Sequence, residues 1–161
     1  MSPTGWLDGT TIHEYQTILR QVNSSIRGFQ QPTLGRIRQF EIMTGDFIQI
    51  LNIKNNHWVC VTLIGCPPIH VKLMDSLAKP VIAKELQELV QALLGPHCQG
   101  ISDIQVQRQM NASDCGVFSI AYATCLVYGQ NPRTVIFDIR RTHQHLHKCL
   151  KTGTMQLFNT T

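Results

Sequence analysis

The sequence has few charged residues and no long apolar run. Of its 161 residues, only 15% are Asp, Glu, Lys or Arg, and the formal net charge is +4. The basic residues are dispersed rather than gathered in one run, so the charge does not indicate nucleic-acid binding. No apolar stretch reaches the roughly 18 residues of a membrane span, so no membrane association is expected.

Secretory and disulfide patterns are also missing. The first residues, MSPTGWLDG, have no basic start followed by an apolar core. The six cysteines include no CxxC pair, and a chain that is 43% hydrophobic can bury a core without disulfides. We therefore expect reduced thiols, a cytoplasmic or nuclear location, and a monomer that forms a single domain over residues 1–161.

Residue spacing predicts both helices and strands. Helical spacing of apolar residues predicts helices over about 11–23, 80–94, 115–128 and 133–151. Alternating or β-rich runs predict strands over 47–51, 57–64, 69–74 and 101–107, and residues 24–45 are mostly loop with at most one short strand. This order of elements indicates an α+β fold with a small central sheet flanked by helices.

Polar residues mark two helix starts. Thr11 and Glu14 have the spacing of a capping box, with Thr11 as the cap. Ser113 or Asp114 is a suitable N-cap for the apolar helix that follows them. Pro80 suits the first turn of the second predicted helix.

Cys115 falls at the predicted start of a helix, with Gly116 beside it. Unpaired backbone N–H groups at such a position carry about half a positive charge, which favours the reactive thiolate form of a cysteine. Gly116 would leave room for a substrate backbone. A single cysteine is more often a small core thiol, so a catalytic role requires a base nearby.

His57 and Asp75 are candidates for that base and its orienting acid. His57 begins one predicted strand and Asp75 follows the next, so an antiparallel hairpin brings both to the same end of the sheet. The histidine could accept the thiol proton while the carboxylate holds its tautomer. Gln109 precedes Cys115 by six residues, and its amide could stabilise an oxyanion together with the Cys115 N–H.

These residues form an ordered set of short motifs. The most specific of them is a glutamine, an asparagine and an Asp-Cys-Gly triplet at fixed spacing. The set comprises Trp6-Leu7, His57-Trp58, Asp75-Ser76-Leu77 and Gln109-x-Asn111-x-x-Asp114-Cys115-Gly116. In this order the chain resembles the ubiquitin-like-protein-specific cysteine proteases, also called SUMO or sentrin proteases, which are distant relatives of the adenovirus protease.

The resemblance implies a papain-like fold with permuted order and a thiol isopeptidase or peptidase that needs no cofactor. It implies that His57, Asp75 and Cys115 form the triad and that Gln109 lines the oxyanion hole. Trp6 and Trp58 would be the aromatic walls of a narrow tunnel that admits a Gly-Gly tail by shape. The other substrate-binding residues that it implies are Leu7, Asp8, Asn111, Asp114 and Gly116.

The implied partner is a ubiquitin-like modifier, and SUMO, ubiquitin and NEDD8 all end in Gly-Gly. The family's usual Trp-Leu-Asn-Asp is Trp6-Leu7-Asp8-Gly9 here, and residues 24–45 are shorter than in typical members. Two alternatives stay open. One is a processing protease of the adenovirus or mobile-element type, and the other is a module that binds a modifier without cutting it.

The His143-x-His145-x-His147 segment could suggest a metal site. On a helix only His143 and His147 share a face, and two ligands are too few for a closed zinc site. We therefore expect no metal and interpret these histidines as a solvated helix face. The remaining cysteines, apart from Cys115, are interpreted as structural thiols.

Overall fold

The computed structural model describes residues 7–54, 56–65, 70–77, 82–97 and 100–158. Trp6 and Pro80, two residues singled out by the sequence, lie outside this part of the chain. The described residues form an α+β fold whose five-stranded sheet has the order β1-β2-β3-β4-β5. The expected architecture is thus confirmed, and the short strand allowed for within residues 24–45 is present as β1.

The strands of the sheet are β1 (Arg27–Gly28), β2 (Phe47–Ile53), β3 (His57–Thr62), β4 (His70–Met74) and β5 (Gly100–Asp103). The three central strands are antiparallel, whereas β1 and β5 pair in parallel with their neighbours. The predicted strand over 101–107 is too long, because only its first residues pair with β4. After Asp103 the chain leaves the sheet and runs toward α3.

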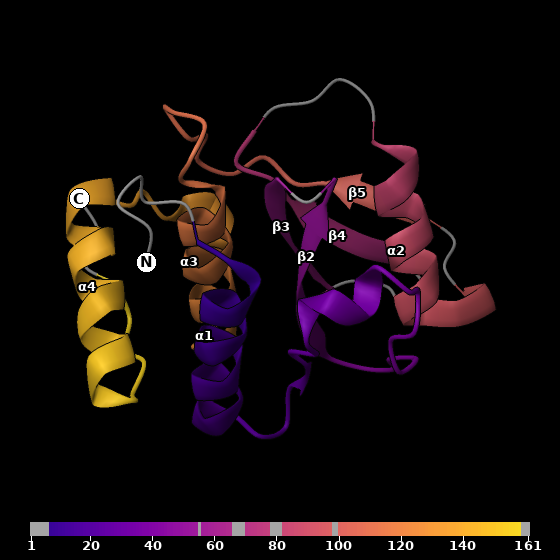
Figure 1. Cartoon of the computed structure of the whole chain (residues 1–161), viewed down its shortest axis with the longest axis horizontal. Coiled ribbons are helices and arrows are strands. Elements are labelled where there is room, and N and C mark those ends of the chain that lie inside the picture. The colour runs from indigo at the N-terminus through magenta and orange to yellow at the C-terminus, as the bar shows by residue number, and fades with distance from the viewer. Residues whose placement is uncertain (1–6, 55, 66–69, 78–81, 98–99, 159–161) are drawn as a thin grey trace.

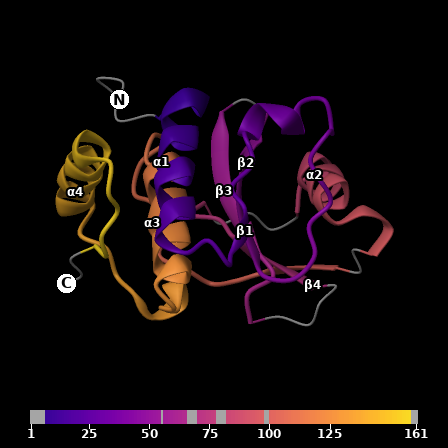
Figure 2. The ribbon, with the colours of Figure 1, turned by 90° about the horizontal axis from the view of Figure 1, so that it is seen from below.

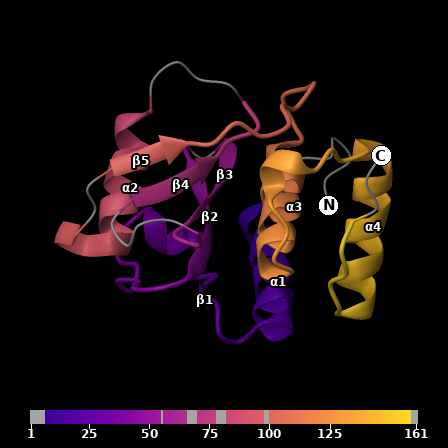
Figure 3. The same ribbon diagram turned by 180° about the vertical axis from the view of Figure 1, so that it is seen from behind.

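Helices cover both faces of the sheet in separate layers (Figures 1 and 2). Helix α2 (Lys84–Leu94) lies on one face, and α3 (Cys115–Val127) with α1 (Gly9–Val22) lies on the other. Helix α4 (Ile139–Thr152) lies outside α3, as the view from behind shows most clearly (Figure 3). Short 3-10 turns span Pro32–Gly35 (η1), Gly95–His97 (η2) and Pro132–Thr134 (η3).

Alternation along β3 divides the core in two. Trp58 and Cys60 belong to the cluster beneath α3, whereas Val59 and Val61 belong to the cluster beneath α2. This is the two-residue period of a strand that is buried on both faces. Helix α3 is buried along almost its whole length, so it is a central helix rather than an amphipathic surface helix.

Three predicted helix starts are wrong. Helix α1 is capped by Asp8, whose carboxylate accepts the Thr11 N–H at 2.8 Å, so Thr11 lies inside the first turn. Helix α2 begins at Lys84, after Ile82, rather than near Pro80. Helix α4 begins at Ile139 and is capped by Asp138, because the preceding residues are held elsewhere by hydrogen bonds.

Candidate active site

Cys115 is the first residue of α3 and is completely buried. Its position at a helix N-terminus is the one predicted from the sequence. Gly116 next to it packs under Leu7 and Trp58. A Cβ atom at residue 116 would lie 3.1 Å from the Leu7 Cβ and 3.3 Å from the Trp58 Cδ1. Glycine therefore allows the N-terminal segment and the indole to close over the start of α3.

His57 and Asp75 meet at one end of the sheet, as the hairpin predicts. β3 and β4 are antiparallel, so the first residue of β3 lies beside the residue that follows β4. The His57 Nε2 and Asp75 Oδ1 atoms are 2.6 Å apart, and both side chains are buried. The Leu77 N–H also donates to Asp75 Oδ1 at 2.9 Å, which fixes the carboxylate.

The charge state of His57 follows from its partners. Burial alone would lower the pKa of His57, but hydrogen bonds to Asp75 and to Cys115, with the charges of both groups, raise it to about 9. Because Nε2 faces Asp75, Nδ1 is the ring nitrogen left for the sulfur. The imidazole is therefore placed between a carboxylate and a thiol and holds a proton at neutral pH.

Gln109 lies next to this group but its amide is already engaged. Its backbone N–H donates to the Ser76 carbonyl at 2.9 Å, and its Oε1 accepts the Ser76 hydroxyl. Its Nε2 donates to the Asn111 carbonyl at 2.5 Å. An amide nitrogen carries two hydrogens, so one of them remains for a further acceptor.

Asn111 and Asp114 order the turn before α3. The Asn111 Oδ1 accepts the N–H groups of Ser113 and Asp114, and its Nδ2 donates to Asp114 Oδ2 at 2.7 Å. Asp114 is the N-cap residue, yet its carboxylate makes no capping hydrogen bond. Its Oδ1 instead pairs with His143 Nε2 at 2.8 Å.

Two expectations are corrected here. A side-chain cap from Ser113 or Asp114 is absent within the described residues, because the Asp114 carboxylate binds Asn111 and His143. His143 is half-buried and hydrogen-bonded, so it does not belong to a purely solvated helix face. Nothing in the sequence pairs it with Asp114, which lies 29 residues earlier.

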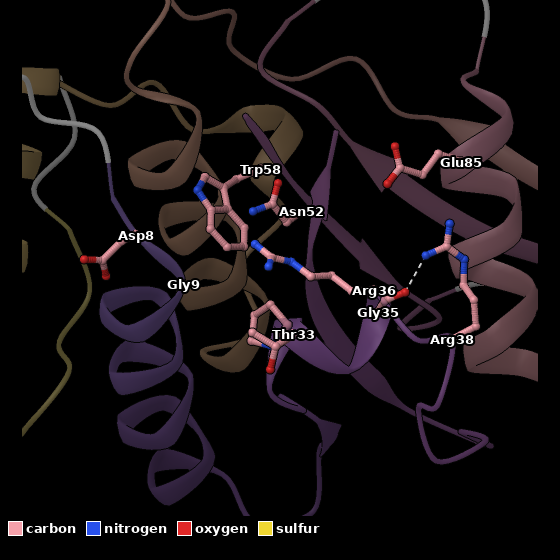
Figure 4. A pocket seen from close by; sticks show the side chains of 10 residues that line it. Asp8, Gly9, Thr33, Gly35, Arg36, Arg38, Asn52, Trp58 and Glu85 are labelled. Carbon is pink, nitrogen blue, oxygen red and sulfur yellow. Dashed lines mark hydrogen bonds between the residues drawn. The ribbon is translucent and has the colours of Figure 1, made fainter. Parts of the chain in front are cut away.

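Trp58 closes one side of a small charged pocket (Figure 4). The indole is 1% exposed, and its Nε1 donates to the Leu7 carbonyl at 2.9 Å. The pocket has a volume of about 200 Å³, and Arg36 extends into it toward Trp58. The other lining residues are Asp8, Gly9, Pro32, Thr33, Gly35, Arg38, Asn52 and Glu85.

Two polar groups in this pocket have unused hydrogen-bonding capacity. The Asn52 Oδ1 is buried and has no hydrogen-bond partner among the described residues. Arg38 pairs with Glu88 at 3.1 Å, whereas the Arg36 guanidinium has no partner in the part of the chain that the structure describes. An unpaired acceptor and an unpaired donor thus face the same space beside Trp58.

A second, more open cavity borders His57. It has a volume of about 520 Å³ and is lined by Asn56, His57, Leu77 and residues 109–112. Met110 at its rim is 96% exposed. His57 therefore borders a cavity that Trp58 does not line.

The remaining chemistry-bearing groups do not add to this site. No cluster of three His, Cys, Asp or Glu side chains suitable for a metal is found among the described residues. Cys60, Cys125 and Cys149 are free and buried, and burial raises the pKa of Cys125 to about 12.

Among the described residues, no helix is long and apolar enough to cross a membrane.

Solved structures with a similar fold include protease domains that act on ubiquitin-like proteins. The yeast Ulp1 C-terminal protease domain, solved in complex with the SUMO ortholog Smt3, matches with a TM-score of 0.68 and 15% identity, over 94% of this chain and 79% of that chain. The Chaetomium thermophilum Ulp1-like SUMO protease catalytic domain matches with a TM-score of 0.58 and 20% identity, over 94% and 74%. The Xanthomonas campestris effector XopD, bound to ubiquitin, matches with a TM-score of 0.58 and 12% identity, over 89% and 90%.

The fold is therefore that of a Ulp1-like cysteine protease domain. No curated protein matches the sequence significantly. The model of the Ulp1 protease family, C-terminal catalytic domain, matches residues 41–152, which is more than half of the chain. The protein belongs to the Ulp1 protease family, and the matched range includes His57, Asp75, Gln109 and Cys115.

Proposed function

We propose that the chain is a cysteine-type isopeptidase or peptidase that cleaves after the C-terminal Gly-Gly of a ubiquitin-like modifier. The observation that carries this proposal is the position of His57, which is hydrogen-bonded to Asp75 at 2.6 Å and whose pKa is raised by Asp75 and by Cys115 at the start of α3. A nucleophile, a base and an orienting acid are the required elements of thiol acyl transfer. On this reading, residues 1–161 form one catalytic domain.

The reaction begins at the sulfur. The Cys115 thiolate attacks the carbonyl carbon of the terminal glycine, and the carbonyl π-bond electrons move to oxygen. The Cys115 N–H, which has no partner within α3 because it lies in the first turn, and the second Nε2 hydrogen of Gln109 stabilise this oxyanion. The tetrahedral intermediate then expels the leaving amine, which takes a proton from His57, and a thioester remains.

Hydrolysis reverses the role of the histidine. Neutral His57 removes a proton from water, and the resulting hydroxide attacks the thioester carbonyl. Collapse of this second intermediate releases the modifier carboxylate and returns the sulfur to its thiolate form. Asp75 keeps the ring in one orientation and stabilises its positive charge in both half-reactions. No metal or organic cofactor enters this sequence.

The packing around Trp58 favours a substrate whose C-terminal tail is narrow. Trp58 packs against Gly116, so a tail that reaches Cys115 passes an aromatic wall, and residues without side chains fit best there. The Asn52 Oδ1 and the Arg36 guanidinium could receive a backbone N–H and a backbone carbonyl of that tail. Leu7 and Asp8 lie at the same wall, and a role for Trp6 stays a prediction.

Parallel assays with fluorogenic C-terminal conjugates of SUMO, ubiquitin and NEDD8 test the proposal. Turnover of at least one conjugate, lost in Cys115→Ala, supports it. The same modifiers with a C-terminal electrophile should form an adduct at Cys115. Binding of a modifier without turnover or adduct would contradict catalysis and favour a binding module, whereas cleavage of tails without Gly-Gly would favour a processing protease.

A further inference from the structure

The loop that carries Gln109 is fastened to the α4 region at two points. This segment, residues 104–114, is called the Gln109 loop below. Near the start of this loop, the Gln107 side chain makes two hydrogen bonds to the backbone of Phe137. The Gln107 Nε2 donates to the Phe137 carbonyl at 3.0 Å, and the Gln107 Oε1 accepts the Phe137 N–H at 2.6 Å. At its end, Asp114 pairs with His143 on α4 at 2.8 Å.

The second attachment continues through the loop to the candidate site. His143 contacts Asp114, Asp114 accepts from Asn111 Nδ2, and the Asn111 carbonyl accepts from Gln109 Nε2. The Asp114 side chain is only 6% exposed, so these partners replace water. One line of hydrogen bonds therefore runs from α4 to the amide proposed for the oxyanion.

The Asp114 carboxylate has two possible sets of hydrogen-bond partners, and His143 belongs to one of them. Aspartate at an N-cap ordinarily turns its carboxylate onto the free N–H groups of its own helix. Here that bond is absent, and the carboxylate points to Asn111 and His143. An ionised carboxylate can only accept, so the His143 Nε2 must carry the hydrogen. Without this donor, the carboxylate would be free to turn onto α3 and release Asn111.

We propose that His143 is a positioning residue that holds Asp114 away from the α3 N–H groups and so keeps the Gln109 loop in its reactive shape. The part of this inference that concerns turnover rests on the function proposed above. His143 does not touch the reacting atoms, and it acts through Asp114 and Asn111. It lies outside the motifs by which the chain resembles its family.

Paired substitutions test this role. His143→Gln keeps a nitrogen donor the same number of bonds from the backbone, whereas His143→Leu keeps bulk and removes the donor. The Leu variant should lower kcat about tenfold and leave KM within about twofold, and the Gln variant should recover most of kcat. Alkylation of Cys115 by iodoacetamide needs no oxyanion hole and should stay within about twofold in both. His147→Leu, at an exposed position one turn along, is the matched control and should resemble the wild type.

Amide hydrogen exchange gives a readout that does not depend on turnover. In His143→Leu, exchange within residues 109–114 should become faster by about tenfold, while β3 and the middle of α3 stay protected. Unchanged exchange in that segment would overturn the positioning role. Faster exchange with an unchanged kcat would overturn its link to turnover. If the wild type cleaves no modifier, the proposed function fails, and the exchange data still decide whether His143 holds the loop.

Discussion

Cys115 and Cys125 lie on the same helix, belong to the same core cluster and are almost equally buried, yet their polar surroundings differ. Cys115, at the first residue of α3, has His57 beside it and Asp75 behind that ring. Cys125, ten residues later, is surrounded by apolar core, and burial raises its pKa to about 12. Burial in apolar surroundings keeps a thiol protonated and inert, whereas a basic imidazole nearby can make a buried thiol a nucleophile.

Substituting the two cysteines gives the largest expected difference. Cys115→Ala should lower turnover of a modifier conjugate by about 1,000-fold or more, because the nucleophile is lost. Cys125→Ala should leave kcat/KM within about twofold and lower only the thermal midpoint by a few degrees, as expected for a small core truncation. Equal loss of activity in both correctly folded variants would break the comparison.

Removing the carboxylate behind His57 should have the next largest effect. Asp75→Asn should lower kcat by about 100-fold, since the ring loses the partner that fixes its orientation. The His57 pKa is raised to about 9, so the required proton is present at neutral pH and is lost as pH rises through about 9.

The pH dependence of kcat/KM checks the same variant. In the wild type, kcat/KM should fall on the alkaline side near pH 9. Asp75 is one cause of the raised pKa, so Asp75→Asn should move this fall to lower pH. An alkaline limb that stays in place would show that a group other than His57 controls it.

Changing the aromatic wall should separate substrate binding from thiol reactivity. Trp58→Phe keeps an aromatic ring but removes the Nε1 hydrogen bond to the Leu7 carbonyl. We expect kcat/KM for a modifier conjugate to fall about tenfold, or about 1.4 kcal/mol, while iodoacetamide alkylation of Cys115 changes little. A large fall in alkylation as well would mean that Trp58 also shapes the thiol environment.

The smallest expected effect concerns the inert thiol. In the Cys115→Ala background, iodoacetamide should label Cys125 only as fast as the core opens, which peptide mapping by mass spectrometry can follow. Labelling should accelerate steeply with denaturant because it tracks unfolding. Rapid labelling of Cys125 in native buffer would show that its surroundings are not as closed as the structure indicates.

Sequence reasoning succeeded where contacts follow from local pattern. Two adjacent β-rich runs predicted a hairpin, and the antiparallel pairing of β3 with β4 brings His57 to Asp75. Apolar continuity predicted the central helix and the place of Cys115 at its start. The family resemblance is confirmed by the matched range and the shared fold.

Prediction from the sequence failed where one side chain had several possible hydrogen-bond partners. Asp8 and Thr11 both suit an N-cap, and only the path of the chain decides between them. The Asp114 carboxylate could bond its own helix or a distant donor, and the donor is on α4. Residues before Ile139 have apolar spacing, but Phe137 is held by Gln107 through its backbone N–H, so the helix begins later.

The bond between Leu7 and Trp58 has a practical consequence for anyone preparing this protein. Leu7 is fully buried, and its carbonyl is the acceptor for an indole that lies against the start of α3. A polypeptide shortened past this leucine would lose the acceptor of the Trp58 Nε1–H and the cover over the start of α3. An affinity handle joined directly before residue 7 would therefore disturb this contact.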